Sequence, residues 1–163
     1  MRWIWIDTFV DFVSGRRASA LKNVTLAEEY LHDHMPGHPV FPPTLMLEGM
    51  AQTAGILVGE ARGFAENVIL AKIRRAEIND YAFPGDQIRY DAVLDSLDDR
   101  AGVTSGTMHK NGKVVGRADM IFSHVRPGES SELPPHNFVF TEQFMRLLAA
   151  FRPRAATGST DAG

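Results

Sequence analysis

The sequence contains no cysteine, and this absence excludes several kinds of site. Without thiols the chain cannot hold a disulfide scaffold, a cysteine nucleophile or a thiolate metal site. A dominant charge is also missing, because 17 Lys and Arg stand against 20 Asp and Glu for a formal net charge of -3. Such a balance gives no reason to expect nucleic acid as a partner. With 163 residues, 44% of them hydrophobic, the composition is typical of one soluble globular domain.

Long uninterrupted apolar runs are missing as well. The N-terminal sequence MRWIWIDTFVDFV is broken by two aspartates and offers no small-residue cleavage site, unlike a secretory signal. The longest apolar stretch, residues 42–61, contains Glu48, Gln52 and Glu60, which are costly within lipid. The sequence therefore predicts a cytoplasmic protein without a membrane span, in which residues 42–61 form a buried helix.

Hydrophobic patterning predicts an α+β domain over residues 1–126. Period-two alternation indicates strands, which we place at residues 4–13, 16–25, 68–80, 87–98, 102–110 and 113–125. The helix at 42–61 is apolar on almost every face and is expected at the centre, after a short helical turn within 26–33. A buried helix near the start of an antiparallel meander requires the sheet to curl around it.

Three glycines interrupt the predicted central helix, at Gly49, Gly55 and Gly59. Glycine inside a helix costs about 1 kcal/mol relative to alanine. We expect another backbone to approach the helix closely at these positions. After residue 126 the composition changes, and residues 127–163 are expected to form a linker, a short amphipathic helix near Phe144 to Phe151 and a disordered tail over 154–163.

Groups able to transfer protons concentrate in residues 32–52, HDHMPGHPVFPPTLMLEGMAQ. The segment supplies three histidines, a lone glutamate at Glu48 within the apolar helix, and Gln52 one turn later on the same face. Apolar neighbours favour a protonated carboxyl group that can donate a proton, and an imidazole can accept one. The alternative is structural: Glu48 is satisfied by an amide or a partner subunit, and the histidines pack among prolines.

The spacing of His32, His34 and His38 raises the question of a metal site. Prolines constrain the loop between these histidines, and no further ligands stand nearby in the sequence. We therefore expect no metal.

The order of these residues resembles a known signature. HMPGHPVFP at residues 34–42 and LMLEGMAQ at 45–52 are similar to GHFPGxPxxPGxLxxEAMAQ, the signature of 3-hydroxyacyl-ACP dehydratases of the FabZ/FabA type. Glu48 follows His34 at the spacing that the signature has between its acid and its histidine. The FPGD sequence at 83–86 resembles the VPGD turn of the family, and ALKNVT at 20–25 resembles its AIKNVT strand. The resemblance extends over residues 6–125.

The resemblance implies a hot-dog fold, in which an antiparallel sheet wraps around one long helix. It also implies a homodimer, able to form a hexamer as a trimer of dimers, with the active site at the dimer interface. His34 would remove the proton α to the thioester, Glu48 of the other subunit would protonate the departing 3-hydroxyl, and Gln52 would orient water or the acid. The remaining residues expected to bind or orient the substrate are Gly37, Phe41, Pro43 and Thr44. No cofactor is implied.

Three departures from the family pattern matter for the proposed chemistry and partner. Asp33 replaces the glycine before the histidine, and a carboxylate there favours a protonated imidazole, which cannot act as a base. Pro43 replaces a glycine whose N–H bonds the thioester oxygen in the family, and losing such a donor costs roughly 3–4 kcal/mol. Glu77 and Asp80 stand where the family tends to be basic. An acidic carrier protein would then depend on Lys72, Arg74, Arg75 or the pair Arg16 and Arg17.

The sequence thus predicts a FabZ-like dehydratase of fatty acid biosynthesis that acts on a 3-hydroxyacyl chain bound to acyl carrier protein. One alternative is another hot-dog enzyme, either a thioesterase or an enoyl-CoA hydratase. A second alternative is a non-catalytic acyl-binding or partner subunit, which the missing N–H of Pro43 keeps open. We expect the C-terminal helix to cover an exposed patch of the sheet, the alternatives being a cap on the acyl tunnel or a brace for the partner subunit.

Overall fold

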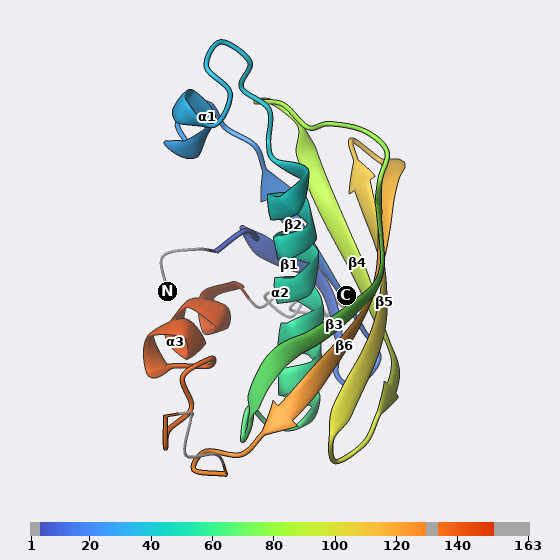
Figure 1. Ribbon diagram of the computed structural model, residues 1–163, viewed down its shortest axis with the longest axis vertical. Helices are drawn as coiled ribbons and strands as arrows, with labels where there is room; N and C mark the ends of the chain where they lie inside the picture. The colour runs from blue at the N-terminus through green and yellow to red at the C-terminus, as the bar shows by residue number, and fades with distance from the viewer. Residues whose placement is uncertain (1–3, 130–133, 152–163) are drawn as a thin grey trace, which may run out of the picture.

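The computed structural model describes residues 4–129 and 134–151, and its main feature is one antiparallel sheet around a long helix (Figure 1). The strands are β1 (Thr8–Val13), β2 (Arg17–Asn23), β3 (Asn67–Ile78), β4 (Gln87–Leu97), β5 (Ala101–Lys110) and β6 (Lys113–Val125). The helices are α1 (Tyr30–Asp33), α2 (Pro43–Ala61) and α3 (Glu142–Phe151). Each predicted strand and helix is confirmed, most of them within a few residues. The tail at 154–163 lies outside the described residues, and the domain boundary at residue 126 stays a prediction.

The strand order β1-β2-β4-β5-β6-β3 corrects the predicted meander. Strand β3 pairs with β6 and not with β4. The connection between β3 and β4 does not close a hairpin, because its residues bond elsewhere. The N–H of Phe41 donates to the carbonyl of Ala82 at 2.8 Å, and the N–H of Gly85 donates to that of Val24 at 2.9 Å. These bonds hold the connection beside the start of α2 and the end of β2, so β4 enters the sheet next to β2. The result is the hot-dog fold.

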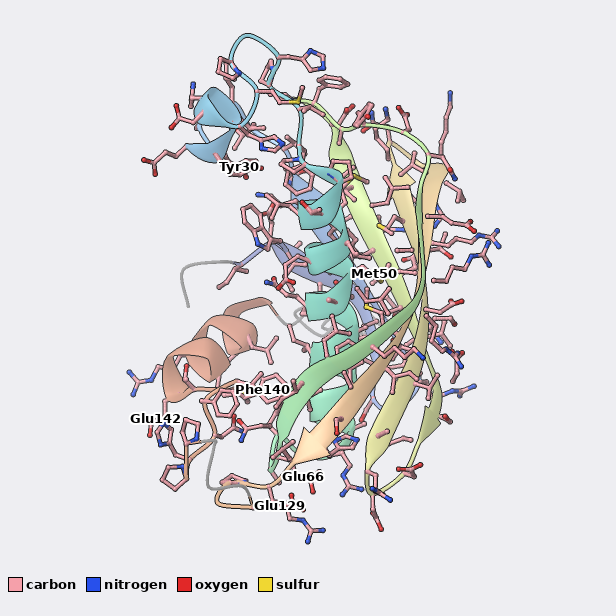
Figure 2. All side chains as sticks on the ribbon, viewed as in Figure 1. Tyr30, Met50, Glu66, Glu129, Phe140 and Glu142 are labelled. Atoms are coloured by element: carbon pink, nitrogen blue, oxygen red, sulfur yellow. The ribbon has the colours of Figure 1, made fainter. Side chains whose placement is uncertain are left out.

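Helix α2 lies in the concave face of the sheet and forms the centre of the core. Met46 and Leu57 on this helix are fully buried, and Met50 lies between the helix and the sheet (Figure 2). This burial confirms the central helix expected from its apolar surface. None of the helices within residues 4–129 and 134–151 is long and apolar enough to cross a membrane.

The glycines of α2 accommodate aromatic rings, which corrects the expected approach of another backbone. A Cβ added at Gly49 would lie 2.5 Å from the Tyr90 ring. A Cβ added at Gly59 would lie 2.6 Å from the Phe140 ring. Both distances are far below normal contact, so each ring requires glycine beneath it. At Gly55 the nearest ring, that of Phe122, would lie at 3.3 Å.

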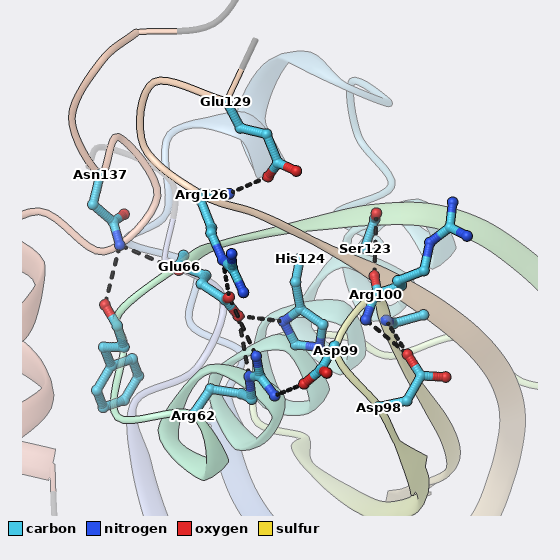
Figure 3. A network of polar contacts seen from close by, with 12 residues as sticks. Arg62, Glu66, Asp98, Asp99, Arg100, Ser123, His124, Arg126, Glu129 and Asn137 are labelled. Atoms are coloured by element: carbon cyan, nitrogen blue, oxygen red, sulfur yellow. Dashed lines mark hydrogen bonds and ion pairs between the residues drawn. The ribbon is translucent and has the colours of Figure 1, made fainter.

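A polar network joins the end of α2 to β3 and β6 (Figure 3). The buried carboxylate of Glu66 accepts hydrogen bonds from Arg62 Nε at 3.1 Å and Arg126 Nε at 3.4 Å, and Arg62 also contacts Asp99 at 3.1 Å. The Arg62 guanidinium holds the pKa of Glu66 below its usual range. His124 Nδ1 lies 3.5 Å from Glu66, and burial lowers the pKa of this imidazole. The network therefore fixes the end of the sheet from which the C-terminal segment continues.

Candidate active site

Glu48 and Gln52 lie one turn apart on α2, and the structure brings their side chains together as predicted. Gln52 Nε2 donates to Glu48 Oε1 at 3.0 Å, and Gln52 Oε1 accepts the backbone N–H of Trp5 at 2.9 Å. Because a backbone N–H can only donate, Trp5 determines which end of the amide faces Glu48. Sequence reasoning missed Trp5, since a backbone donor leaves no signal in the residue pattern.

The carboxylate of Glu48 is exposed in the single chain. The burial expected from its apolar sequence neighbours is therefore wrong for one chain alone. Leu45, Met46 and Leu47 precede it in sequence, but a helix directs consecutive side chains to different faces. Met46 is fully buried on the sheet side. Exclusion of water from Glu48 therefore has to come from a substrate or from another chain.

His34 directly follows α1, and its side chain is exposed. Its backbone N–H donates to the carbonyl of Tyr30 at 3.0 Å, and the Tyr30 ring meets the Trp5 ring edge-on with centroids 5.2 Å apart. Within residues 4–129 and 134–151, no hydrogen bond or ion pair joins His34 to Glu48. A single chain thus brings Glu48 and Gln52 together and leaves the expected base apart from them.

The loop between His34 and α2 is held by its backbone and by one buried ring. Gly37 has a φ of +78°, in the left-handed region that favours glycine. Phe41 is fully buried, and its ring lies 6.1 Å from Trp5 and 6.0 Å from Tyr30 between centroids. We therefore expect Phe41 to orient the loop from the core and not to touch the substrate.

The histidines of this region do not gather into a metal site in the structure. The described part of the chain holds no group of three or more His, Asp or Glu side chains placed to bind a metal ion. His38 instead packs edge-on against Phe83, with ring centroids 5.4 Å apart.

The start of α2 presents backbone donors beside the predicted site. Pro43 is the first helical residue, where proline is favoured because its fixed φ suits the helix. The carbonyl of Pro42 accepts the N–H groups of Leu45 at 2.9 Å and Met46 at 3.1 Å. Thr44 is exposed, and its N–H makes no hydrogen bond to any residue that the structure describes. The first open donor of this helix is therefore Thr44, as expected if it replaces the N–H missing at Pro43.

An apolar cavity of about 360 Å³ begins beside Glu48 and Gln52. Its walls come from α2, β3, β6 and the segment before α3. The lining residues are Glu48, Ala51, Gln52, Gly55, Ile56, Val68, Leu70, Phe122, Val139 and Phe140. A carboxyl group and an amide at one end of an apolar cavity fit a ligand with a polar reacting group and a hydrocarbon chain.

Some of the cations expected to meet an acidic carrier protein are already paired. Arg75 bonds Glu77 at 2.8 Å, and Arg17 bonds Asp11 at 2.7 Å. Lys72, Arg74 and Arg16 are exposed, and none of them forms an ion pair with a residue that the structure describes. Because paired surface ions attract a partner less, these three cations are the ones most open to an acidic partner.

Comparison with known proteins places the chain in a family. A model of the FabA-like domain matches residues 4–119. A 3-hydroxyacyl-acyl-carrier-protein dehydratase FabZ of Granulibacter bethesdensis is 35% identical over 135 residues, covering 80% of this chain and 78% of that protein. Its namesake in Pelotomaculum thermopropionicum is 32% identical over 122 residues, covering 74% and 87%. The dehydratase heterocomplex ApeI:P of Xenorhabdus doucetiae superposes with a TM-score of 0.66 and 17% identity over 78% of this chain and 86% of that one, a likeness of fold alone.

Proposed function

This chain belongs to the FabA-like family, and we propose that it dehydrates a 3-hydroxyacyl thioester carried by acyl carrier protein to a trans-2-enoyl thioester in fatty acid biosynthesis. The observation that carries the proposal is Glu48, held by Gln52 at the mouth of an apolar cavity. His34 removes the proton from the carbon next to the thioester carbonyl, and the electron pair of the broken C–H bond forms the new double bond. Glu48 gives its proton to the departing hydroxyl, which leaves as water.

We propose that two copies of the chain complete the site. Strand β3 is the last strand of its sheet, no strand of the described residues pairs with its outer edge, and Leu70 and Ile73 are exposed. An open edge with apolar side chains favours pairing with another strand. His34 of one copy would then serve Glu48 of the other, which accounts for two exposed proton-transfer groups that do not meet within one chain. Further assembly into a hexamer and a cytoplasmic location stay predictions of the sequence.

The direct test uses purified protein with 3-hydroxyacyl-ACP and the matching trans-2-enoyl-ACP, followed by mass spectrometry. We expect interconversion in both directions, and we expect H34A and E48Q each to abolish it while the protein stays folded and dimeric. A folded wild-type protein that converts no chain length would contradict the proposal. Turnover that persists in either variant would remove that residue from the mechanism.

The shared site has a sharper test, in which the two inactive variants are mixed. After subunit exchange, each mixed dimer contains one site with both His34 and Glu48 intact and one site with neither. Because half of the dimers are mixed and half of their sites are complete, about a quarter of wild-type activity should return. If both residues of a site came from the same chain, mixing would restore nothing.

Pro43 favours a second candidate, a subunit that binds acyl chains without turnover. It removes the backbone donor that the family places at the start of the helix, and the open N–H of Thr44 is the replacement that catalysis requires. The same assay separates the two functions. Binding of acyl-ACP without any interconversion would support the non-catalytic subunit.

A further inference from the structure

Val139 and Phe140 line the same cavity as Glu48. Phe140 packs on Gly59, which lies eleven residues after Glu48 on the same helix, about 16 Å along its axis. We propose that these two residues close the acyl cavity and set the longest chain that the site accepts. This inference rests on the proposed function, because it takes the acyl chain of the thioester as the occupant of the cavity.

The ring of Phe140 has little freedom to move. It is 8% exposed, sits directly over the backbone of Gly59, and meets the ring of Phe64 edge-on with centroids 4.9 Å apart. Figure 2 shows it between α2 and the segment that leads into α3. A chain that extended past this point would have to displace a packed aromatic side chain.

Val139 and Phe140 form what we call the wall of the cavity, and a buried amide fixes the backbone of this wall. Asn67, at the start of β3, is 1% exposed, and its Oδ1 accepts the N–H of Phe138 at 2.9 Å and of Val139 at 3.3 Å. A buried polar side chain that bonds a remote segment keeps one conformation, since leaving its oxygen unpaired costs free energy. The wall is therefore part of the fold and not a loosely attached tail.

Asn137 holds the same segment from its other side. Its Nδ2 donates to the carbonyls of Phe64 and Glu66, both at 3.2 Å, and its Oδ1 accepts the N–H of Phe140 at 2.7 Å. The wall is thus bonded to two backbone carbonyls of the connection between α2 and β3. Its residues also lie beyond 4–119, the part of the chain that the family model matches.

The chemistry of the lining identifies the occupant as a hydrocarbon. Apart from Glu48 and Gln52 at the mouth, the side chains that line the cavity are those of Ala51, Ile56, Val68, Leu70, Phe122, Val139 and Phe140, all apolar. Each methylene that enters such a cavity improves binding about fourfold, and each one kept out by the wall forfeits that gain. The kcat/KM values of the protein should therefore rise with the length of the acyl substrate and then fall abruptly.

The test measures kcat/KM for 3-hydroxyacyl-ACP substrates of increasing even chain length. F140A should raise the ratio of long-chain to short-chain kcat/KM by about tenfold, and V139F should lower it, because one variant opens the cavity and the other fills it. F140L repeats the test with less loss of packing. The matched control is L148A, since Leu148 is as buried as Phe140 but lines a different cavity. L148A should be destabilised and keep the wild-type length profile.

A second measurement separates failure of this inference from failure of the proposed function. Alkyl-pantetheine thioethers of the same lengths carry no leaving group, so their binding can be followed by calorimetry without turnover. If the wild type is inactive but F140A removes a length limit in thioether binding, the chain-length inference is supported and the dehydratase function is contradicted. If the wild type is active and F140A keeps the length profile of L148A, the chain-length inference is contradicted and the dehydratase function is supported.

Discussion

The backbone N–H of Trp5 and the side-chain oxygen of Gln52 are joined by a hydrogen bond of 2.9 Å, and this bond turns the amide nitrogen toward Glu48. Trp5 also packs against Tyr30, whose carbonyl holds the backbone of His34. The segment before β1 therefore supports both proton-transfer residues of the proposed site. It does so without contributing a reacting group.

The first prediction tests the donor that Gln52 offers to Glu48. In Q52E the remaining oxygen still accepts from Trp5, but a second carboxylate replaces the nitrogen that donates to Glu48. Losing a hydrogen bond to an ionisable group costs about 1.5–3 kcal/mol, so kcat should fall roughly tenfold to a hundredfold. Q87E makes the same chemical change at an exposed residue of β4 and should leave kcat unaltered. Equal kcat in Q52E and Q87E would remove Gln52 from the site.

The second prediction concerns Gly49, where the family signature has alanine. A Cβ there would lie 2.5 Å from the Tyr90 ring, in the middle of the core. Overpacking of this kind costs about 1–3 kcal/mol, so G49A should unfold at lower denaturant concentration than the wild type. In the Y90V background, which lacks the ring, G49A should cost less stability than it does in the wild type. If the loss in G49A/Y90V equals the sum of the losses in the two single variants, this account is contradicted.

The third prediction concerns the hydroxyl of Tyr90. Burial raises the pKa of this phenol, which stays neutral, and its Oη has no hydrogen-bond partner among the residues that the structure describes. An unpaired buried hydroxyl costs about 1–3 kcal/mol. Y90F should therefore be at least as stable as the wild type when unfolding is followed by circular dichroism in urea. A marked loss of stability in Y90F would reveal a partner for this hydroxyl.

The repeating patterns of the sequence predicted the elements of the fold better than their connections. Strand alternation and the apolar helix depend on local side-chain order, and both are seen in the structure. The partner of β3 depends on distant bonds, such as that from Phe41 N–H to the Ala82 carbonyl, which no local pattern reveals. Pro84 and Gly85 indicated a turn correctly, but Gly85 bonds Val24 and the connection crosses to a different strand.

The candidate site was predictable to a similar extent. The spacing of Glu48 and Gln52 predicted their contact, because one helical turn separates them. The exposure of Glu48 was not predicted, because its apolar sequence neighbours lie on other faces of the helix. The wall at Phe140 was missed as well, although Gly59 left a signal: a glycine inside a helix indicates that a bulky group lies against it.

The fourth prediction is a pH dependence of stability from His124. Burial lowers the pKa of His124 from its ordinary value of 6.5, while Glu66 opposes the shift. Just below pH 6.5, the unfolded chain therefore binds a proton at this histidine that the folded chain does not bind. Stability should fall as the pH drops below 6.5, by at most about 1.4 kcal/mol per pH unit from this group. Glu66, whose pKa is lowered, adds a loss in the same direction below about pH 4.5.

The measurement is the free energy of unfolding in urea between pH 5 and pH 8. H124L should show a smaller slope over this range than the wild type, because the histidine that titrates on unfolding is gone. H136L removes an exposed histidine and should keep the wild-type slope. If H124L and H136L gave the same slope, the acid sensitivity would have to come from other groups.

The last prediction restores the backbone donor that Pro43 lacks. P43G supplies an N–H at the first position of α2, where the family signature has glycine, and leaves the bonds from Leu45 and Met46 to the Pro42 carbonyl in place. Glycine for proline costs about 0.4–1 kcal/mol through the unfolded chain, which the folded protein can tolerate. If the thioester oxygen lacks a donor in the wild type, kcat should rise, within the limit of roughly a hundredfold to a thousandfold set by one oxyanion donor.

P43A provides the control, because alanine also carries an N–H but keeps a more restricted backbone than glycine. Both variants should gain kcat if the missing donor limits the wild type, and the gain should appear in kcat more than in KM, since the oxyanion forms only in the transition state. If neither variant gains, the N–H of Thr44 already serves the thioester oxygen. In that case T44P, which removes the next donor, should lose most of the activity while P43A retains it.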